Sequence, residues 1–180
     1  MMAAWKPEAQ NMAAEELMEV FTAEEEALMG LALAEAALAA EEGEVPAGAV
    51  LLDPQGRVAA RGRNRVIGLS DPSAHAEMLA IRQAAAQTGN YRLSGFTLFS
   101  TLEPCPMCLT AAIHARLESI VYGAPEPRWG AAGSLLDLAA LPGLNHRLRL
   151  RGGLRAGECG GIISDFFKNK RAAARVDRKE

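Results

Sequence analysis

The fold and the chemistry of this chain are decided by residues 71–77, which read Asp-Pro-Ser-Ala-His-Ala-Glu, and by residues 103–108, which read Glu-Pro-Cys-Pro-Met-Cys. In the second stretch, Cys105 and Cys108 form a C-x-x-C pair, and Pro104 is expected at the first position of a helix. That spacing lets two thiolates bind one Zn²⁺ at about 2.3 Å, and the free N–H groups of a helix start stabilise both sulfurs. A thioredoxin-like redox pair has the same spacing and the same helix start. The pair by itself therefore predicts a zinc site and a redox site equally.

His75 and Glu77 shift that balance towards zinc. One His and two Cys with an open fourth position are the ligand set of a catalytic zinc, whereas a structural site is closed by a fourth protein ligand. A neighbouring carboxylate can take a proton from the water at such a zinc and pass it on. The pattern His-x-Glu…Pro-Cys-x-x-Cys is typical of zinc deaminases, in which the Glu is not a ligand. We therefore predict one zinc ion held by His75, Cys105 and Cys108, with Glu77 as the catalytic proton carrier; the alternative for His75 is a core histidine bonded to the backbone.

This prediction sets a geometric condition on His75 and Glu77. Residues two positions apart on an ideal helix point to nearly opposite sides, so the two side chains would not converge. Both must therefore lie at the entry of a helix. The preceding Asp71-Pro72-Ser73 is a helix-start signal that fits this placement.

The rest of the sequence alternates helical and strand patterns. Residues 22–25 have the capping-box form of a helix start, and residues 53–56 read as a turn that joins two strands in a hairpin. Alternation of strands and helices predicts an α/β layered domain with at least partly parallel strands, and no second domain after residue 22. Helices are expected over residues 22–42, 75–87, 105–116 and from about 156, and strands over residues 48–52, 57–65, 96–101, 117–122 and 145–150.

Four further residues with metal-binding or acid–base side chains receive other interpretations. Cys159 lies in a Gly-rich segment and is expected to be a buried, inert thiol. His114 falls on the opposite side of its helix from Cys108 and is not expected to be a ligand. His146 is interpreted as a substrate or structural contact, and Glu103 as a helix N-terminal charge rather than a residue supporting the ligands.

Composition excludes several classes of protein. Hydrophobic residues make up 49% of the chain and charged residues 23%, which is the balance of a soluble globular protein. No run of 18 apolar residues occurs, so no membrane span is expected. Three cysteines, an odd number, argue against a disulfide framework and favour a reducing, cytoplasmic setting.

Charge is distributed unevenly along the chain. Residues 1–46 hold 11 acidic residues and one basic residue, and residues 1–21 are predicted to be a flexible acidic extension. Residues 146–180 hold ten Lys or Arg and four Asp or Glu. A basic C-terminal stretch favours a polyanionic partner, although a solvated helix face is the simpler alternative.

With these residues in place, the sequence resembles the bacterial tRNA-specific adenosine deaminases of the cytidine deaminase superfamily. The resemblance runs from about Glu44 to about Arg171. It implies hydrolytic deamination of the wobble adenosine of tRNA to inosine, a homodimer, and a three-layer fold with a five-stranded mixed sheet between helices. The matching blocks are residues 44–50, 64–65, 71–77, 90–93, 101–105, 113–116, 130–135, 145–147 and 164–167.

The resemblance also implies contacts with the substrate, a tRNA anticodon loop. Asn64 and Ala76 are expected to contact the target nucleoside. Phe166, Phe167 and Lys168 are expected on the nucleic-acid face, where aromatic stacking and positive charge suit a single-stranded RNA loop. The resemblance therefore favours RNA binding by the basic C-terminal stretch over the alternative of a solvated helix face.

The sequence departs from the family pattern in three places: at Pro106, at Val66, and over residues 125–129, which read Pro-Glu-Pro-Arg-Trp. None of these is a ligand or the proton carrier. Two other functions stay open: a zinc deaminase of a free nucleobase, nucleoside or nucleotide, and a redox or closed structural zinc site. The last leaves His75 and Glu77 unexplained.

Overall fold

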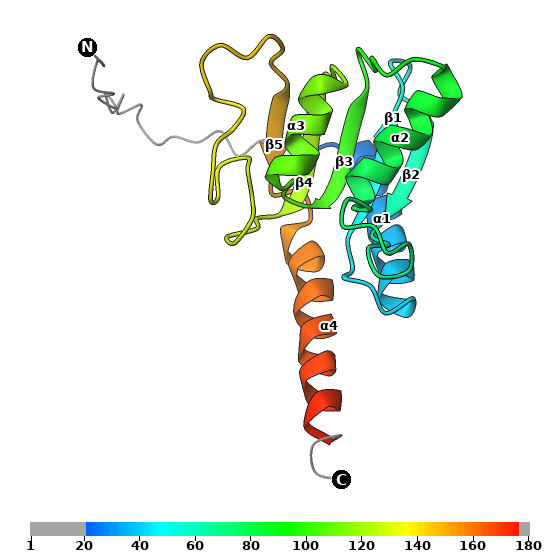
Figure 1. Ribbon diagram of the computed structural model, residues 1–180, viewed down its shortest axis with the longest axis vertical. Helices are drawn as coiled ribbons and strands as arrows, with labels where there is room; N and C mark the ends of the chain where they lie inside the picture. Colours follow the sequence, from blue (N-terminus) through cyan, green and yellow to red (C-terminus); the bar gives the residue numbers. More distant parts are fainter. Residues whose placement is uncertain (1–20, 177–180) are drawn as a thin grey trace, which may run out of the picture.

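The computed structural model describes residues 21–176, with side chains through residue 173. The predicted acidic extension therefore lies outside the described residues except for Phe21, as do residues 177–180 of the basic stretch. Every predicted helix and strand is present, in the predicted order (Figure 1). The elements are α1 (Ala23–Glu41), β1 (Gly48–Leu52), β2 (Val58–Arg63), α2 (Ala76–Thr88), β3 (Thr97–Leu102), α3 (Pro106–His114), β4 (Ser119–Ala124), β5 (Arg149–Gly152) and α4 (Ala156–Val176).

The five strands form one mixed sheet in the order β2-β1-β3-β4-β5. β1 runs antiparallel to both β2 and β3, whereas β3, β4 and β5 are parallel to one another. The carboxyl ends of β3 and β4 therefore lie at one edge of the sheet, the lower edge in Figure 1. The segments that follow these two strands are brought together at that edge.

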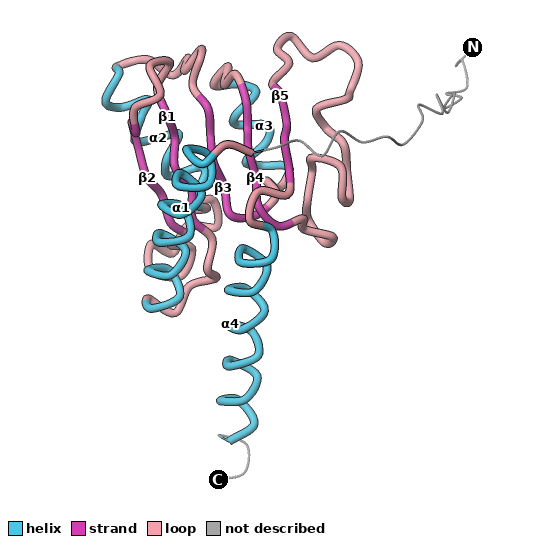
Figure 2. The backbone as a smooth tube through the Cα atoms, turned by 180° about the vertical axis from the view of Figure 1, so that it is seen from behind, coloured by secondary structure: helices cyan, strands magenta, loops and turns pink. Residues whose placement is uncertain are grey.

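Helices cover both faces of the sheet, so the strands are buried on both sides. Along β1, Ala49 and Leu51 belong to a core cluster with residues of α2 and α3, while Val50 and Leu52 belong to a second cluster with residues of α1 and α4. This alternation follows from the two-residue period of a strand. Figure 2 shows α1 and α4 on the near side of the sheet. The predicted three-layer arrangement, with a five-stranded mixed sheet between helices, is confirmed.

A close contact between β2 and α2 fixes where α2 begins. A Cβ atom at Gly62 of β2 would lie 2.1 Å from the carbonyl oxygen of Ala76, the first residue of α2. Only glycine lets the two backbones approach this closely. Because Ala76 separates His75 from Glu77, this contact also fixes the position of both predicted functional residues.

One detail differs from the sequence expectations, and one matches closely. The fifth strand begins at Arg149 rather than Asn145, because the carbonyl of Asn145 and the ring of His146 bond to Arg116 and to the backbone of Leu117. The capping box at Thr22 is present in full. Among the described residues, no helix is long and apolar enough to cross a membrane.

Candidate metal centre and active site

α2 begins directly after His75, which satisfies the geometric condition set by the sequence. His75 is the N-cap residue, with extended backbone angles of φ −71° and ψ 154°, and Glu77 is the second residue of the helix. Because His75 lies outside the helical turn, the rule for residues two positions apart on a helix does not separate the two side chains. Both lie at the helix entry.

α3 begins in the same way at the edge of the neighbouring strand. Cys105 is its N-cap residue and Cys108 lies in its first turn. The prediction that Pro104 occupies the first helical position is wrong, because Pro106 does. A proline fits that position since its missing N–H would have no partner inside the helix. Pro104 instead accepts a hydrogen bond at its carbonyl from the N–H of Ala131, at 2.9 Å.

The two helix starts bring three metal-binding atoms together. One ligand atom each from His75, Cys105 and Cys108 lies within 4.8 Å of the others. The Nδ1 atom of His75 is 3.7 Å from the Sγ atom of Cys105 and 3.5 Å from that of Cys108. Within the described residues the group contains these three donors and no fourth. A closed structural zinc site would need that fourth ligand, so the arrangement favours an open, catalytic one.

The pKa values of the three donor groups also fit the binding of a cation. A hydrogen bond from Cys108 lowers the pKa of the Cys105 thiol to about 4, and the same interaction raises the pKa of Cys108. The hydrogen bond with Cys105 raises the pKa of His75, against the effect of burial. The two cysteine sulfurs share one proton beside the imidazole of His75. A Zn²⁺ ion bound by these three groups would take the place of that proton.

Glu77 lies beside this group but not in it. Its side chain is 5% exposed, and burial raises the pKa of its carboxyl group. Charge on His75 and on Cys105 also shifts the pKa of this carboxyl group, so it lies close to the metal donors. A carboxyl group with a raised pKa exchanges protons near neutral pH more readily than an exposed one.

Asn64 is buried at the end of β2 and is held there by a carboxylate. Its side-chain amide donates to Glu44 at 3.3 Å, and the backbone N–H of Gly68 donates to the other oxygen of Glu44 at 2.7 Å. Glu44 is itself 2% exposed. The sequence does not indicate a role for Glu44, because nothing in its neighbourhood along the chain shows that it is buried against Asn64, 20 positions away.

Glu103 is the third buried carboxylate, after Glu77 and Glu44, and its predicted role is wrong. It neither caps α3 nor contacts a ligand; it binds the loop that follows β4. Its two oxygens accept hydrogen bonds from the N–H groups of Glu126, Ala132 and Ser134 at 2.9, 2.9 and 3.1 Å, and from the hydroxyl of Ser134. This loop is thereby attached to the residue two positions before Cys105.

Replacing Glu103 by glutamine should destabilise the fold in a pH-dependent way. Burial alone would raise the pKa of Glu103, but the hydrogen bonds from Ser134, Glu126 and Ala132 lower it overall. The carboxylate therefore stabilises the fold fully above the ordinary Glu pKa of about 4.3, and this stabilisation is lost as the pH falls through the folded-state pKa. We expect Glu103→Gln to reduce the free energy of unfolding by about 2 kcal/mol at pH 7.

Urea unfolding at pH 7 and at about pH 3 measures this effect, and the difference between the two proteins should shrink at the lower pH. Glu118→Gln, which removes an exposed ion pair with Arg149, serves as the control and should cost less than about 1 kcal/mol. An equal loss for Glu103→Gln at both pH values would contradict this account.

The family to which these residues belong is shown by comparison with known proteins. The profile of the cytidine and deoxycytidylate deaminase zinc-binding region matches residues 22–124, which contain both helix starts of the site. The chain belongs to this deaminase family. Within the family it groups with the tRNA-specific adenosine deaminases: the Bacillus subtilis protein of that name is 42% identical over 156 residues, covering 87% of this chain and 96% of the relative.

Two further comparisons extend the family relationship. A solved structure from a study of A-to-I editing by tRNA:A34 deaminases at the wobble position of transfer RNA has a TM-score of 0.73 and 43% identity, covering 76% of this chain and 98% of that one. A Deinococcus radiodurans protein named tRNA(Ile)-lysidine synthase is 49% identical over 144 residues, or 78% of this chain. This chain spans about a quarter (24%) of that longer relative.

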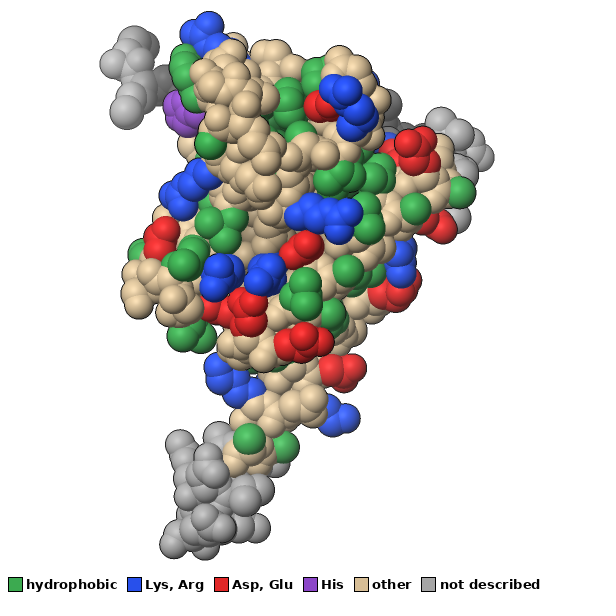
Figure 3. Space-filling model, turned by 90° about the vertical axis from the view of Figure 1, so that its right-hand side faces the viewer, with side chains coloured by type: hydrophobic (Ala, Val, Ile, Leu, Met, Phe, Trp, Pro, Cys, Tyr) green, Lys and Arg blue, Asp and Glu red, His purple; other side chains and the backbone are tan. Residues whose placement is uncertain are grey.

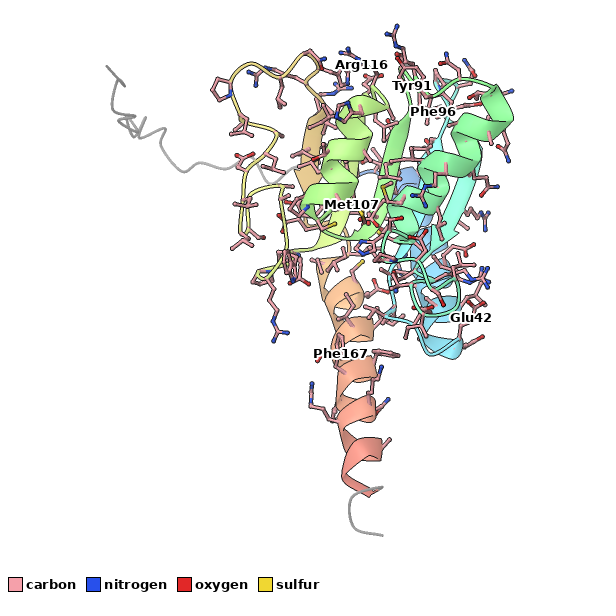
Figure 4. All side chains as sticks on the ribbon, viewed as in Figure 1. Glu42, Tyr91, Phe96, Met107, Arg116 and Phe167 are labelled. Atoms are coloured by element: carbon pink, nitrogen blue, oxygen red, sulfur yellow. The ribbon has the colours of Figure 1, made fainter. Side chains whose placement is uncertain are left out.

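The residues that the family resemblance assigned to RNA lie on α4, away from the metal donors. Figure 4 shows Phe167 on the part of α4 that extends beyond the sheet, whereas Met107 lies in the first turn of α3. The rings of Phe166 and Phe167 meet edge to face at 5.4 Å, and the ammonium of Lys170 lies 5.6 Å from the Phe166 ring. Lys168 is exposed on the same helix.

The other histidines and the third cysteine lie where the sequence analysis placed them. His114 is exposed and outside the donor group, and the ring of His146 makes a structural hydrogen bond to the carbonyl of Leu117 at 2.6 Å. Cys159 is fully buried, and burial raises the pKa of its thiol to about 11. None of the three adds a ligand to the site.

Proposed function

We propose that this chain is a zinc-dependent hydrolase that converts the wobble adenosine of a tRNA anticodon to inosine and releases ammonia. The observation that carries this proposal is the group of His75, Cys105 and Cys108 with the buried carboxyl of Glu77 beside it. The relatives named tRNA-specific adenosine deaminase, and the structure from the study of tRNA:A34 deaminases, support the choice of substrate.

Each residue has a separate part in the reaction. When bound by His75, Cys105 and Cys108, a zinc ion would lower the pKa of a water in its fourth position towards about 7. The Glu77 carboxylate accepts a proton from the attacking water and delivers protons to the ring nitrogen and then to the leaving amine. Water and adenosine thus become inosine and ammonia, with no other reactant.

Asn64 and Ala76 hold the nucleoside in this proposal. Both are buried: Asn64 directly follows β2, and Ala76 lies between His75 and Glu77. The hydrogen bond to Glu44 consumes part of the donor capacity of the Asn64 amide and fixes its orientation. An amide that is already oriented loses little entropy when it binds a nucleoside.

RNA would be held by α4, which carries unpaired positive charge. On the face of the molecule shown in Figure 3, basic and acidic side chains are interspersed. Arg63, at the end of β2, forms ion pairs with Glu35 and Glu42. By contrast, no ion pair involves Lys168, Lys170 or Arg171 within the part of the chain that the structure describes. Cations without ion-pair partners remain available to phosphate groups.

Replacing these three α4 cations together by alanine should weaken RNA binding and flatten its dependence on salt. If each contacts one phosphate, the slope of log K against log salt should fall by about 2 for a single-stranded loop. Affinity for an anticodon stem-loop, measured by fluorescence anisotropy between 50 and 200 mM salt, checks this. An unchanged slope would remove α4 from the RNA-binding surface.

The proposal also includes a homodimer and a cytoplasmic location. The homodimer follows from the family resemblance, and the cytoplasmic location follows from the three cysteines, an odd number that argues against a disulfide framework. Sedimentation of the zinc-loaded protein tests the dimer directly.

A comparison of substrates tests the assignment to tRNA. The zinc-loaded protein is supplied with an anticodon stem-loop containing a wobble adenosine and, separately, with free adenosine, cytidine and guanine, and ammonia release is measured. We expect release from the stem-loop and none above background from the small molecules. Release from a small molecule alone would identify the chain as a deaminase of free bases or nucleosides.

A further inference from the structure

Trp129 is a large aromatic side chain that the active-site chemistry leaves unused. It lies on the loop that follows β4, and 67% of its surface is exposed to solvent. A single exposed apolar residue on a loop is ordinary. Its location and the residues around it give Trp129 a more specific interpretation.

The loop that carries Trp129 is fixed to the metal centre by its backbone. The next residue, Gly130, is buried, and a Cβ atom there would lie 2.5 Å from the carboxyl group of Glu103. The N–H of Ala131 donates to the carbonyl of Pro104, the residue before Cys105, at 2.9 Å. Trp129 is therefore two residues from a direct backbone contact with Pro104, the residue before the N-cap of α3.

The loop also lies beside the helix assigned to RNA. It leaves β4 at the edge of the sheet where α4 begins (Figure 1). The first turns of α4 pack against the end of β4, since a Cβ atom at Gly123 would lie 2.4 Å from the sulfur of Cys159. Trp129 is thus held at the same edge of the sheet as the metal donors and the first turns of α4.

Charge next to Trp129 favours an anionic partner. Arg128 is exposed, and within residues 21–173 its guanidinium group has no ion pair or hydrogen bond to a side chain. The nearest acid in the loop, Glu126, is engaged internally, because its Oε1 atom accepts the backbone N–H of Arg128 at 2.9 Å. An exposed indole beside an unpaired guanidinium is a combination that binds single-stranded nucleic acid through stacking and phosphate contact.

We propose that Trp129 stacks on a nucleobase adjacent to the target nucleotide in a single-stranded RNA loop, while Arg128 contacts the neighbouring phosphate. This inference rests on the proposed function and adds a contact that the sequence analysis did not assign. Because every base has a π-face, the contact holds the RNA in place without reading its sequence. Both residues lie in the stretch 125–129 that departs from the family pattern.

Fluorescence tests the stacking directly, because the sequence contains only one other tryptophan, Trp5. In the Trp5→Phe protein all indole emission comes from Trp129. We expect an anticodon stem-loop to quench this emission in a saturable way. A fully paired RNA duplex, which has no single-stranded loop, should not quench it. Saturable binding by anisotropy without any quenching would overturn the proposal.

Kinetics provide the second test. Trp129→Ala should raise the KM for the stem-loop by roughly 10-fold with kcat nearly unchanged, and Trp129→Phe should restore most of the loss, since phenylalanine also stacks. Tyr91→Ala is the matched control: Tyr91 is 64% exposed, and it lies at the opposite edge of the sheet (Figure 4). It should leave KM unchanged.

A stem-loop lacking the base next to the target nucleotide separates stacking from a structural effect. On this abasic RNA, Trp129→Ala should have little further effect, because the stacking partner is already gone. Two abasic RNAs are tested, one for each base that flanks the target nucleotide. The proposal is overturned if Trp129→Ala raises the KM on both of them as much as on the intact stem-loop. If the parent protein deaminates no RNA at all, the proposed function fails. If it deaminates the stem-loop normally and Trp129→Ala leaves the KM unchanged, only the role of Trp129 fails.

Discussion

Glu77→Gln is expected to lower kcat by about 10³-fold while the protein keeps one zinc ion per chain. Glutamine has the size and shape of glutamate but cannot carry the proton between the attacking water and the leaving amine. The side chain is buried, and burial raises the pKa of its carboxyl group, so the neutral amide is not expected to destabilise the fold.

Single-turnover deamination of an anticodon stem-loop measures the chemical step, and zinc is measured on the same preparation. Glu158→Gln, an exposed carboxylate on α4, should behave like the parent protein in both assays. Loss of the zinc together with the activity would mean that Glu77 is a ligand. Retained activity would mean that another group carries the proton.

Cys108→Ser is expected to remove both zinc and activity. Changes to residues that only support a metal ligand already cost about 10- to 100-fold in affinity, so loss of a ligand should cost more than about 100-fold. Zinc content after dialysis against a weak chelator should fall from one ion per chain to nearly none.

Cys159→Ala supplies the matched control for this substitution. Cys159 is a buried cysteine in the core cluster on the α1 and α4 side of the sheet, and it lies outside the metal donor group. This variant should lose some stability, because burying a smaller side chain leaves a cavity, but should keep its zinc. Full zinc occupancy in Cys108→Ser would exclude Cys108 as a ligand.

The order of the elements and the metal donors were predictable because they depend on local patterns. The apolar run 48–52 predicts β1, and the capping box at Thr22 predicts the start of α1. The His-x-Glu and C-x-x-C spacings identify the donors without knowledge of the fold. Each of these signals lies within a few consecutive residues, so the sequence alone contains it.

The errors share the opposite property, because each depends on a contact between distant segments. Glu103 was interpreted as a helix charge, yet it binds Ser134, which is 31 residues away. Pro104 was placed inside α3, but its carbonyl bonds to Ala131 and the helix begins two residues later. Glu44 received no role because its partner Asn64 lies 20 residues further along the chain. Such pairings become visible only when the sheet brings the segments together.

The measurement that tests the central claim most directly is the position of inosine in a treated RNA. An anticodon stem-loop with adenosine at the wobble position and a second adenosine elsewhere in the loop is incubated with the zinc-loaded protein, digested with a base-specific ribonuclease, and its fragments are weighed by mass spectrometry. We predict a mass gain of about one dalton, the replacement of an amine by an oxygen, in the fragment with the wobble base alone. No gain in any fragment, from protein shown to hold zinc, would contradict the assignment to wobble adenosine.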